Sequence, residues 1–224
     1  MTVGRCPHGE MLRFAQHDGG PVLRISGERF GGISTREEFH DYHLRLEFKC
    51  GSKKWIPRKS DKRDSGILYH AVGEHGADGG FWMRSQEFQV QEGDCGDYWG
   101  VAGGSFEVRA VRGGASGYVF DPDGETLTFN EMSKVGRRCI RKEDAENPYG
   151  EWNQVDIYCH GRTAVHMING RVVMVLKESG QIDNGVVTPL TRGKIQIQSE
   201  GAEIYYRNIR LRKIDSIPVG ITAR

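Results

Sequence analysis

The sequence predicts an all-β protein, folded as a two-sheet antiparallel sandwich of the jelly-roll type. Apolar and polar residues alternate with period two along many short stretches, as expected for strands with one buried and one wet face. Glycine supplies 31 of the 224 residues, about twice its ordinary share, which is typical of a chain rich in turns. No segment longer than ten residues has a helical apolar period, so the sheets must pack on each other.

The period-two stretches follow one another along most of the chain. Asn169-Gly170 fits a type I′ turn and predicts a hairpin, and Gly201 predicts another turn. Residues 139–148 are polar and fit either a short surface helix or an ordered loop. Because no linker or repeat divides the chain, residues 1–224 are expected to form a single domain. Strands are expected at residues 22–27, 44–49, 66–70, 87–91, 155–160, 163–169, 171–176, 194–198 and 202–214.

Charge and hydropathy exclude two classes of partner. The chain has 31 basic and 30 acidic residues, so its net charge of +1 provides no field that would attract nucleic acid or an anionic membrane. The longest strongly apolar run, residues 172–176, is far too short to span a bilayer. The basic segment 53–63 surrounds Trp55, and we interpret it as a solvated loop or as a rim over a ligand site.

The cysteines and the N-terminal residues indicate the cellular compartment in which the protein is expected. The five cysteines are odd in number and contain no C-x-x-C pair, so isolated reduced thiols are expected. The first residues, MTVGRCPHGEMLRF, lack the apolar segment of a secretory signal. A cytoplasmic location is therefore expected, with a periplasmic or secreted location as the alternative if a leader has been removed.

The stretch from 64 to 100 contains the densest set of polar and aromatic side chains. Strand parity places Glu87, Gln89 and Gln91 on one face and Phe88 on the other. Glutamine beside glutamate offers paired donors and acceptors that suit sugar hydroxyls, although a solvated exterior would show the same alternation. Aromatic faces, which pack on the apolar side of a pyranose, occur nearby in sequence at Tyr69, Trp82, Tyr98 and Trp99.

Six segments of this chain also carry a family resemblance. They are FGGISTREEFHDYHLRLEFK, RDSGILYH, SQEFQVQEGDCGDYW, EWNQVDIYCHG, INGRVV and GKIQIQSEGAEIYYRNIRLRKI, and they cover most of residues 30–214. In this order they resemble the 3-keto-disaccharide hydrolase family, whose fold is a concanavalin A-like jelly roll of the lectin and glucanase type. The resemblance implies an enzyme, a lyase or hydrolase, that cleaves glycosides already oxidised to a ketone at C3.

The residues themselves disfavour the mechanism of an ordinary glycosidase, which needs two carboxyl groups beside the bond. Jelly-roll glucanases often carry E-x-D-x-x-E, whereas this chain has Glu87, Gln89 and Glu92, and Glu92 would face away from Glu87 on a regular strand. A 3-keto sugar avoids this requirement, because the ketone acidifies the hydrogen on C2. One base can then remove that proton, and the C1 substituent is eliminated.

Three residues are predicted to perform the chemistry. His70 is the first candidate for a base or metal ligand, with a buried structural histidine as the alternative. Glu87 is the second candidate for proton transfer, and Glu47 has a supporting role unless Arg45 simply neutralises it. If the three face one trough, Glu47, His70 and Glu87 could hold a divalent cation that polarises the ketone. No cofactor is certain, and that cation is the one candidate.

Seven further residues are predicted to contact the sugar. Two turn regions are excluded from the site: Asp94 and Asp97 are expected to shape a turn rather than bind calcium, and Asp121 to Gly124 fits a β-turn. The oligomeric state is undetermined by the sequence. The alternatives are a lectin-like glycan-binding module without activity and a conventional jelly-roll glycoside hydrolase. The predicted substrate-binding residues are Arg45, Lys54, Trp55, Arg58, Gln89, Gln91 and His166.

Overall fold

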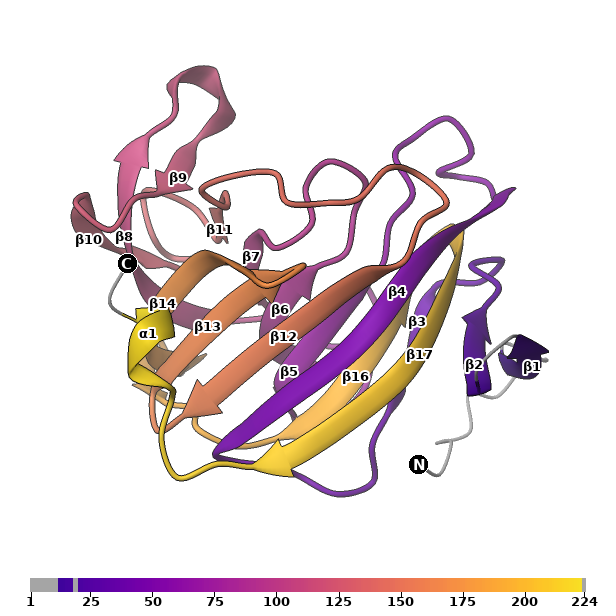
Figure 1. Ribbon diagram of the computed structural model, residues 1–224. Helices are drawn as coiled ribbons and strands as arrows, with labels where there is room; N and C mark the ends of the chain where they lie inside the picture. The colour runs from indigo at the N-terminus through magenta and orange to yellow at the C-terminus, as the bar shows by residue number, and fades with distance from the viewer. Residues whose placement is uncertain (1–11, 18–19, 223–224) are drawn as a thin grey trace.

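Two antiparallel sheets lie face to face in the computed structural model, which describes residues 12–17 and 20–222 (Figure 1). The all-β sandwich prediction is confirmed. The strands of the larger sheet are β1 (Leu12–His17), β2 (Gly20–Ile25), β4 (Tyr42–Lys54), β8 (Gly104–Arg112), β9 (Tyr118–Phe120), β10 (Glu125–Phe129), β12 (Asn153–His160), β13 (Thr163–Ile168), β14 (Arg171–Asp183), β15 (Val186–Pro189) and β17 (Ala202–Lys213). Those of the smaller sheet are β3 (Gly31–Ser34), β5 (Gly66–Val72), β6 (Arg84–Gln89), β7 (Tyr98–Val101), β11 (Arg138–Cys139) and β16 (Lys194–Ser199).

The order of the strands decides which side chains can meet. The larger sheet has eleven strands in the order β1-β2-β17-β4-β12-β13-β14-β8-β10, with β9 paired to β8 and β15 paired to β14. The smaller sheet has six strands in the order β11-β7-β6-β5-β16-β3 and lies behind the larger one in Figure 1. Strands β5, β6 and β16 are therefore neighbours in one sheet.

The hydrophobic core fills the space between the two sheets. Leu44, Leu46 and Phe48 of β4 face inward from the larger sheet, and Ile67 and Phe88 face inward from the smaller one; all five are buried. Burying such side chains stabilises the fold by about 1.5–3 kcal/mol each. Because side chains alternate along a strand, the residues between these apolar positions face outward.

The predicted turns are confirmed. Ile168 pairs with Arg171, and Asn169 and Gly170 between them have φ values of 50° and 79°, the positive values that a type I′ turn requires. Gly201, with φ of 77°, connects β16 to β17. All nine strands expected from alternation are present, and the additional strands include the short β7, β9 and β11, where the alternating pattern has little room to repeat.

The segment 139–148 forms the end of β11 and then a loop, so the alternative of a surface helix is wrong. The helical elements in residues 12–17 and 20–222 are a 3-10 turn at Gly114–Ser116 and α1 (Val219–Thr222). Neither is long and apolar enough to cross a bilayer. The four described cysteines, Cys50, Cys95, Cys139 and Cys159, are free thiols, and Cys6 lies outside the described residues.

One irregularity in β5 changes the geometry of the predicted site. The pairing of β5 with β6 shifts register between Tyr69 and Val72, and His70 has a φ of 50°. Such a bulge adds a residue to one strand and reverses the expected direction of the side chains that follow. The parity that held for Glu87 therefore cannot be extended to His70.

Candidate functional site

A hollow of about 260 Å³ lies on the outer face of the smaller sheet. Glu87 and Gln89 of β6 face outward into it, because Phe88 between them faces the core. Loop residues close the sides. The lining consists of Arg58, Asp64, Asp78, Trp82, Glu87, Gln89, Gln91, Trp99, Val101, Arg137, Arg138, Gln198 and Glu200.

Gly66 makes room for the polar floor of this hollow. A Cβ at this position would lie 2.2 Å from Glu87 Oε1 and 2.4 Å from Gln198 Oε1. Because glycine has no Cβ, the two side chains can lie across β5 from β6 and β16, its neighbours on either side. The carboxyl group of Glu87 and the amide of Gln198 thus lie close together above Gly66.

Glu87 is the buried acid of the hollow. The residue is only 6% exposed, and its carboxyl group makes no hydrogen bond or ion pair with another described residue. Burial raises the pKa of Glu87 well above its ordinary value, and the negative charges of Asp64 and Glu200 raise it further. Burial therefore favours the protonated form of Glu87, which in that form is a hydrogen-bond donor facing the hollow.

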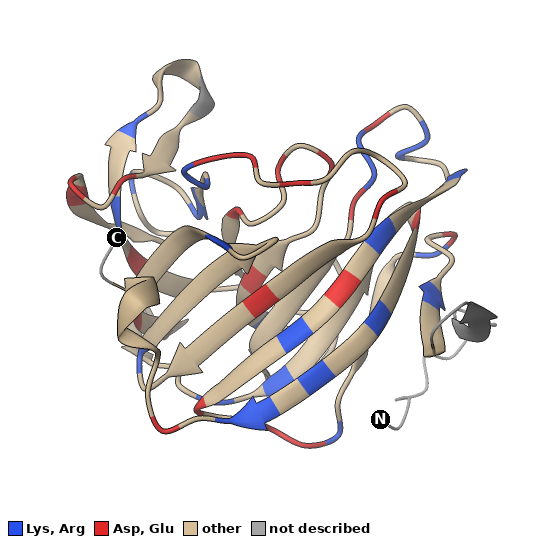
Figure 2. Cartoon of the chain, in the orientation of Figure 1, with Lys and Arg blue, Asp and Glu red and all other residues tan. Residues whose placement is uncertain are grey.

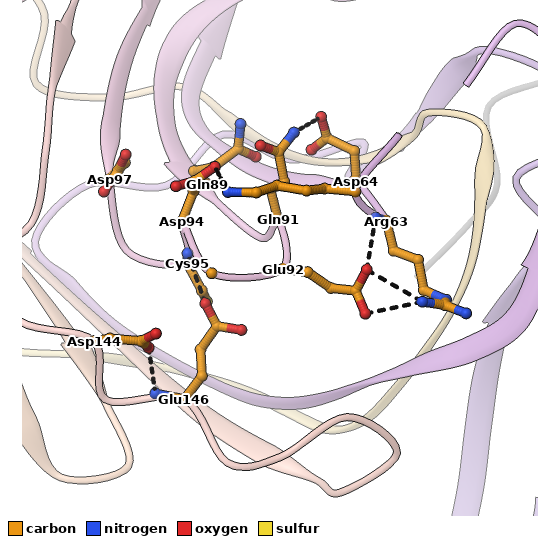
Figure 3. A network of polar contacts seen from close by, with 12 residues as sticks. Arg63, Asp64, Gln89, Gln91, Glu92, Asp94, Cys95, Asp97, Asp144 and Glu146 are labelled. Atoms are coloured by element: carbon orange, nitrogen blue, oxygen red, sulfur yellow. Dashed lines mark hydrogen bonds and ion pairs between the residues drawn. The ribbon is translucent and has the colours of Figure 1, made fainter. Parts of the chain in front are cut away.

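Two more carboxyl groups lie beside Arg58. Arg58 Nη1 is 2.6 Å from Asp64 Oδ2 and also pairs with Glu200. Burial raises the pKa of Asp64 to about 6 against the attraction of Arg58, and burial together with the charge of Asp64 raises the pKa of Glu200 to about 7. The amide of Gln91 donates to Asp64 (Figure 3). This group can accept or release a proton near neutrality.

Several polar atoms of the hollow have no hydrogen-bond partner among the residues that the structure describes. They are the donors Trp99 Nε1 and Arg58 Nε and the acceptors Gln198 Oε1 and Asp64 Oδ1, all buried. Leaving such an atom unsatisfied costs about 1–3 kcal/mol, so a cluster of them indicates a ligand with both donors and acceptors. Sugar hydroxyl and carbonyl groups have this property.

The hollow brings together four of the predicted site residues: Arg58, Glu87, Gln89 and Gln91. Sequence reasoning missed two acidic residues of the hollow, Asp64 and Glu200, and assigned neither to the site. Gln198 was visible as the polar side of an alternating strand but was not assigned to the site. Of the four nearby aromatic residues, Trp82 and Trp99 line the hollow, whereas Tyr69 and Tyr98 are buried in the core.

The prediction that His70 lies beside Glu87 is wrong. The bulge in β5 turns the imidazole into the core, where its ring centroid is 5.7 Å from that of Tyr42 and 5.5 Å from that of Tyr69. His70 is 1% exposed, neither ring nitrogen has a hydrogen-bond partner in the part of the chain that the structure describes, and burial lowers its pKa to about 4. The imidazole is therefore neutral at physiological pH and is absent from the lining of the hollow.

Glu47 and Arg45 also lie elsewhere, on the outer face of the larger sheet, because Leu44, Leu46 and Phe48 beside them face the core. Figure 2 shows basic and acidic residues interspersed along the strands of this sheet. Glu47 accepts hydrogen bonds from Arg207 Nε at 2.6 Å and Asn208 Nδ2 at 2.8 Å, and Arg45 Nε donates to Asp156 at 2.6 Å. With Glu47 outside one sheet, His70 between the sheets and Glu87 outside the other, the predicted metal set does not assemble. Residues 12–17 and 20–222 contain no cluster of three His, Cys, Asp or Glu side chains suited to a metal ion.

The other predicted contacts with sugar do not line the hollow. Lys54 Nζ donates to the carbonyl of Asp61 at 2.7 Å, and Trp55 Nε1 donates to the carbonyl of Ser26 at 3.0 Å. His166 is buried between the sheets, where Nε2 accepts from the Tyr69 hydroxyl at 2.8 Å and burial lowers its pKa to about 3. These three residues have structural roles, since the side chain of each is engaged within the fold.

The acidic turn after β6 is also structural. Asp97 accepts hydrogen bonds from the backbone N–H of Arg141 and from Arg138, and Lys62 pairs with Asp94 at 2.7 Å. The prediction of a turn rather than a calcium site agrees with these contacts. Figure 3 shows the carboxylate of Glu92 on Arg63, so the third carboxylate of the glucanase pattern is engaged away from the hollow.

Comparison with known proteins identifies a family and a fold. The sequence model of the 3-keto-alpha-glucoside-1,2-lyase-like domain matches residues 9–212. Two solved structures from Parabacteroides distasonis, both provisionally named glycosyl hydrolases, have TM-scores of 0.54 and 0.53 at 20% and 17% identity, covering 90% and 92% of this chain and 90% and 86% of theirs. The carbohydrate-binding module CBM66 of Bacillus subtilis has a TM-score of 0.51 at 8% identity, covering 90% of this chain and 92% of its own. A comparison with curated protein sequences finds no match.

Proposed function

The chain belongs to the 3-keto-alpha-glucoside-1,2-lyase-like family, and we propose that it cleaves 3-keto glycosides in the hollow around Glu87. The observation that carries this proposal is the buried, unpaired carboxyl group of Glu87 among unsatisfied donors and acceptors. Active sites are where a fold tolerates such groups, because a bound substrate satisfies them. The fold that the chain shares with a carbohydrate-binding module supports a sugar as the ligand.

The proposed reaction is an elimination next to the C3 ketone. A base removes the proton from C2, and the electron pair of that C–H bond moves to the ketone oxygen as an enolate. The pair then returns to form the C1=C2 double bond, while the C1–O bond breaks and its electrons leave with the departing oxygen. That oxygen takes up a proton, which gives an enone and a free alcohol. Addition of water to the enone completes a net hydrolysis.

Two carboxyl groups of the hollow have pKa values suited to the two roles. Glu200 is the proposed base, because a pKa of about 7 leaves a large ionised fraction at neutral pH while keeping the group basic. It returns the proton to the departing oxygen. Glu87, whose protonated form is favoured by burial, is proposed to donate a hydrogen bond to the ketone oxygen where the enolate charge develops. Arg58 holds Glu200 in place and is a positioning residue.

The unsatisfied atoms are proposed to orient the ring. Trp99 Nε1 can donate to a sugar oxygen, and Gln198 Oε1 and Asp64 Oδ1 can accept from sugar hydroxyl groups. Near-attack geometry of this kind supplies a large part of enzymatic rate enhancement. Gln89 is less available, because its Oε1 already accepts from the backbone N–H of Val90 at 3.0 Å.

Incubation with a methyl 3-keto glucoside tests the proposal, with products followed by mass spectrometry and the unoxidised glucoside as control. Release of methanol with an enone or 3-keto glucose, and no reaction of the control, is the expected result. Binding of both sugars without turnover would instead support a lectin-like module, and cleavage of the unoxidised glucoside a conventional hydrolase. A parallel incubation with chelator tests the predicted cation, and we expect no change in rate, since Arg58 already balances charge beside the carboxylates.

A further inference from the structure

An aromatic cluster borders the hollow on one side. Phe30, Phe81 and Trp82, which we name the aromatic rim, have ring centroids 5.4 Å (Phe30 to Phe81), 6.2 Å (Phe30 to Trp82) and 5.7 Å (Phe81 to Trp82) apart. Trp82 itself lines the hollow. Phe30 approaches Arg58, another lining residue: a Cβ on Gly201 would lie 3.0 Å from Arg58 Cβ and 3.5 Å from Phe30 Cε1. The rim is therefore continuous with the polar site.

The rim exposes apolar surface that the fold does not use. Phe81 is 40% exposed, and Phe30 and Trp82 are half-buried. The loop that carries Phe81 is nevertheless held in place, because the Phe81 N–H donates to the Asp78 carbonyl at 2.9 Å and the Asp78 carboxylate pairs with Arg137 at 3.0 Å. A fixed loop that presents aromatic rings beside a polar hollow is a preorganised contact surface.

The polar groups next to these rings are already engaged. The indole N–H of Trp82 donates to the carbonyl of Gly31 at 3.1 Å, and Asp78 is occupied by Arg137. A second sugar on the rim would have to share or displace these contacts to satisfy its hydroxyl groups. A flat apolar ring needs only faces and edges to pack against, at ring separations of about 4.5–7 Å.

We propose that the rim binds an aromatic leaving group, so that the substrates of this site are aryl 3-keto glycosides. This inference rests on the proposed function, since it places the sugar in the hollow and the aglycone on the rim. The departing oxygen is then a phenol oxygen, which carries negative charge more readily than an aliphatic alkoxide. The rim then selects the leaving group, whereas the carboxyl groups of the hollow perform the reaction.

The test compares phenyl and methyl 3-keto glucosides of the same anomeric configuration. Stacking on the rim should lower KM about tenfold for the phenyl substrate, the fold-change that corresponds to about 1.4 kcal/mol. Phe81→Ala should abolish this preference, Phe81→Tyr should keep it, and the surface control Val186→Ala should leave it unchanged, since Val186 is exposed in β15, away from the hollow. A 3-keto disaccharide that is preferred over the phenyl substrate in a Phe81-dependent way would overturn the proposal.

Saturation-transfer NMR with unoxidised phenyl glucoside gives a readout that needs no turnover. The aromatic protons should receive saturation from the wild type and from Phe81→Tyr, and much less from Phe81→Ala. If no 3-keto glucoside is cleaved but this signal depends on Phe81, the rim is an aromatic site and the proposed function fails. Cleavage of both glucosides with equal KM and no aromatic saturation would refute the rim and leave the function intact.

Discussion

The outer faces of the two sheets are both polar, yet their charges are arranged differently. On the larger sheet, hydrogen bonds from His43 and Arg45 outweigh burial and lower the pKa of Asp156, and those from Asn208 and Arg207 do the same for Glu47. On the smaller sheet, Glu87 has no such partner among the described residues, and burial raises its pKa.

This difference separates a stabilising surface from a candidate active site. Charges paired across neighbouring strands contribute modestly to stability and leave nothing for a ligand to satisfy. A buried carboxyl group without a partner destabilises the free protein, and its retention points to a role in binding or chemistry. The alternating patterns of β4 and β6 look alike in sequence, so pairing in three dimensions distinguishes the two faces.

The largest expected effect comes from removing the acid on each face in turn. Glu87→Gln keeps the shape of the side chain but replaces a carboxylic acid with a far weaker one, and kcat/KM on a 3-keto glucoside should fall at least ~10²-fold. Glu47→Gln, the matched change on the larger sheet, should alter it less than about twofold, because this partly exposed pair lies on the other sheet and does not contact the hollow. Equal losses in the two variants would remove the distinction between the faces.

A smaller loss is expected from Gly66→Ala. The added Cβ meets the ends of two flexible side chains, so Glu87 and Gln198 should be displaced while the backbone stays in place. We expect kcat/KM to fall about tenfold, since misplaced catalytic groups lose rate steeply. Gly220→Ala is the control, because a Cβ there meets open space. Full activity of Gly66→Ala would show that the reaction does not depend on the positions of Glu87 and Gln198.

The pH dependence of stability should differ between the faces. For Glu200 the folded pKa of about 7 exceeds the ordinary value of 4.5, so its favourable contribution is complete below pH 4.5 and is lost as the pH rises toward 7. Glu200→Gln removes this loss and should gain about 1–2 kcal/mol of unfolding free energy relative to wild type between pH 5 and 8. Denaturant titrations of the variant and the wild type at the two ends of this pH range measure the change in unfolding free energy. If the unfolding free energies of the variant and the wild type differed by the same amount at every pH, the raised pKa of Glu200 would be contradicted.

The smallest effect is expected for the stability contribution of the Glu47–Arg207 pair. Its lowered pKa means that Glu47 contributes at neutral pH and loses that contribution in acid. Since both side chains are partly exposed, Glu47→Gln should cost less than about 1 kcal/mol, and salt should reduce the cost further. A loss of several kcal/mol of unfolding free energy in a urea titration would contradict this expectation, because it would show that the pair contributes far more than a partly exposed ion pair.

Local patterning predicted the outward positions of Glu87 and Gln89 because alternation is a property of a single regular strand. It failed for His70, because one extra residue in β5 reverses the direction of the side chain and no residue type marks that bulge. Glu47 was predicted to support the chemistry of Glu87, but β4, which carries it, belongs to the other sheet. Strand order depends on contacts between distant segments, and a local pattern contains no information on it.

The carboxyl groups around Arg58 show the same limit. Arg58 and Glu200 are 142 residues apart and meet only because a loop after β4 lies beside the end of β16. Asp64 begins the polar stretch 64–100, but its local sequence gives no reason to place it beside Glu87. Composition and alternation thus predicted the fold and part of the floor of the hollow. The position of the charged residues beside it, Arg58, Asp64 and Glu200, depended on tertiary packing.

Deuterium at C2 of the substrate tests the central claim most directly, that the hollow removes this proton before the glycosidic bond breaks. A 3-keto glucoside labelled at C2 should be cleaved more slowly than the unlabelled compound, and the label should pass to the departing alcohol or to water. Cleavage at equal rates with the label retained at C2 would contradict the account, because the bond would then break without abstraction of that proton.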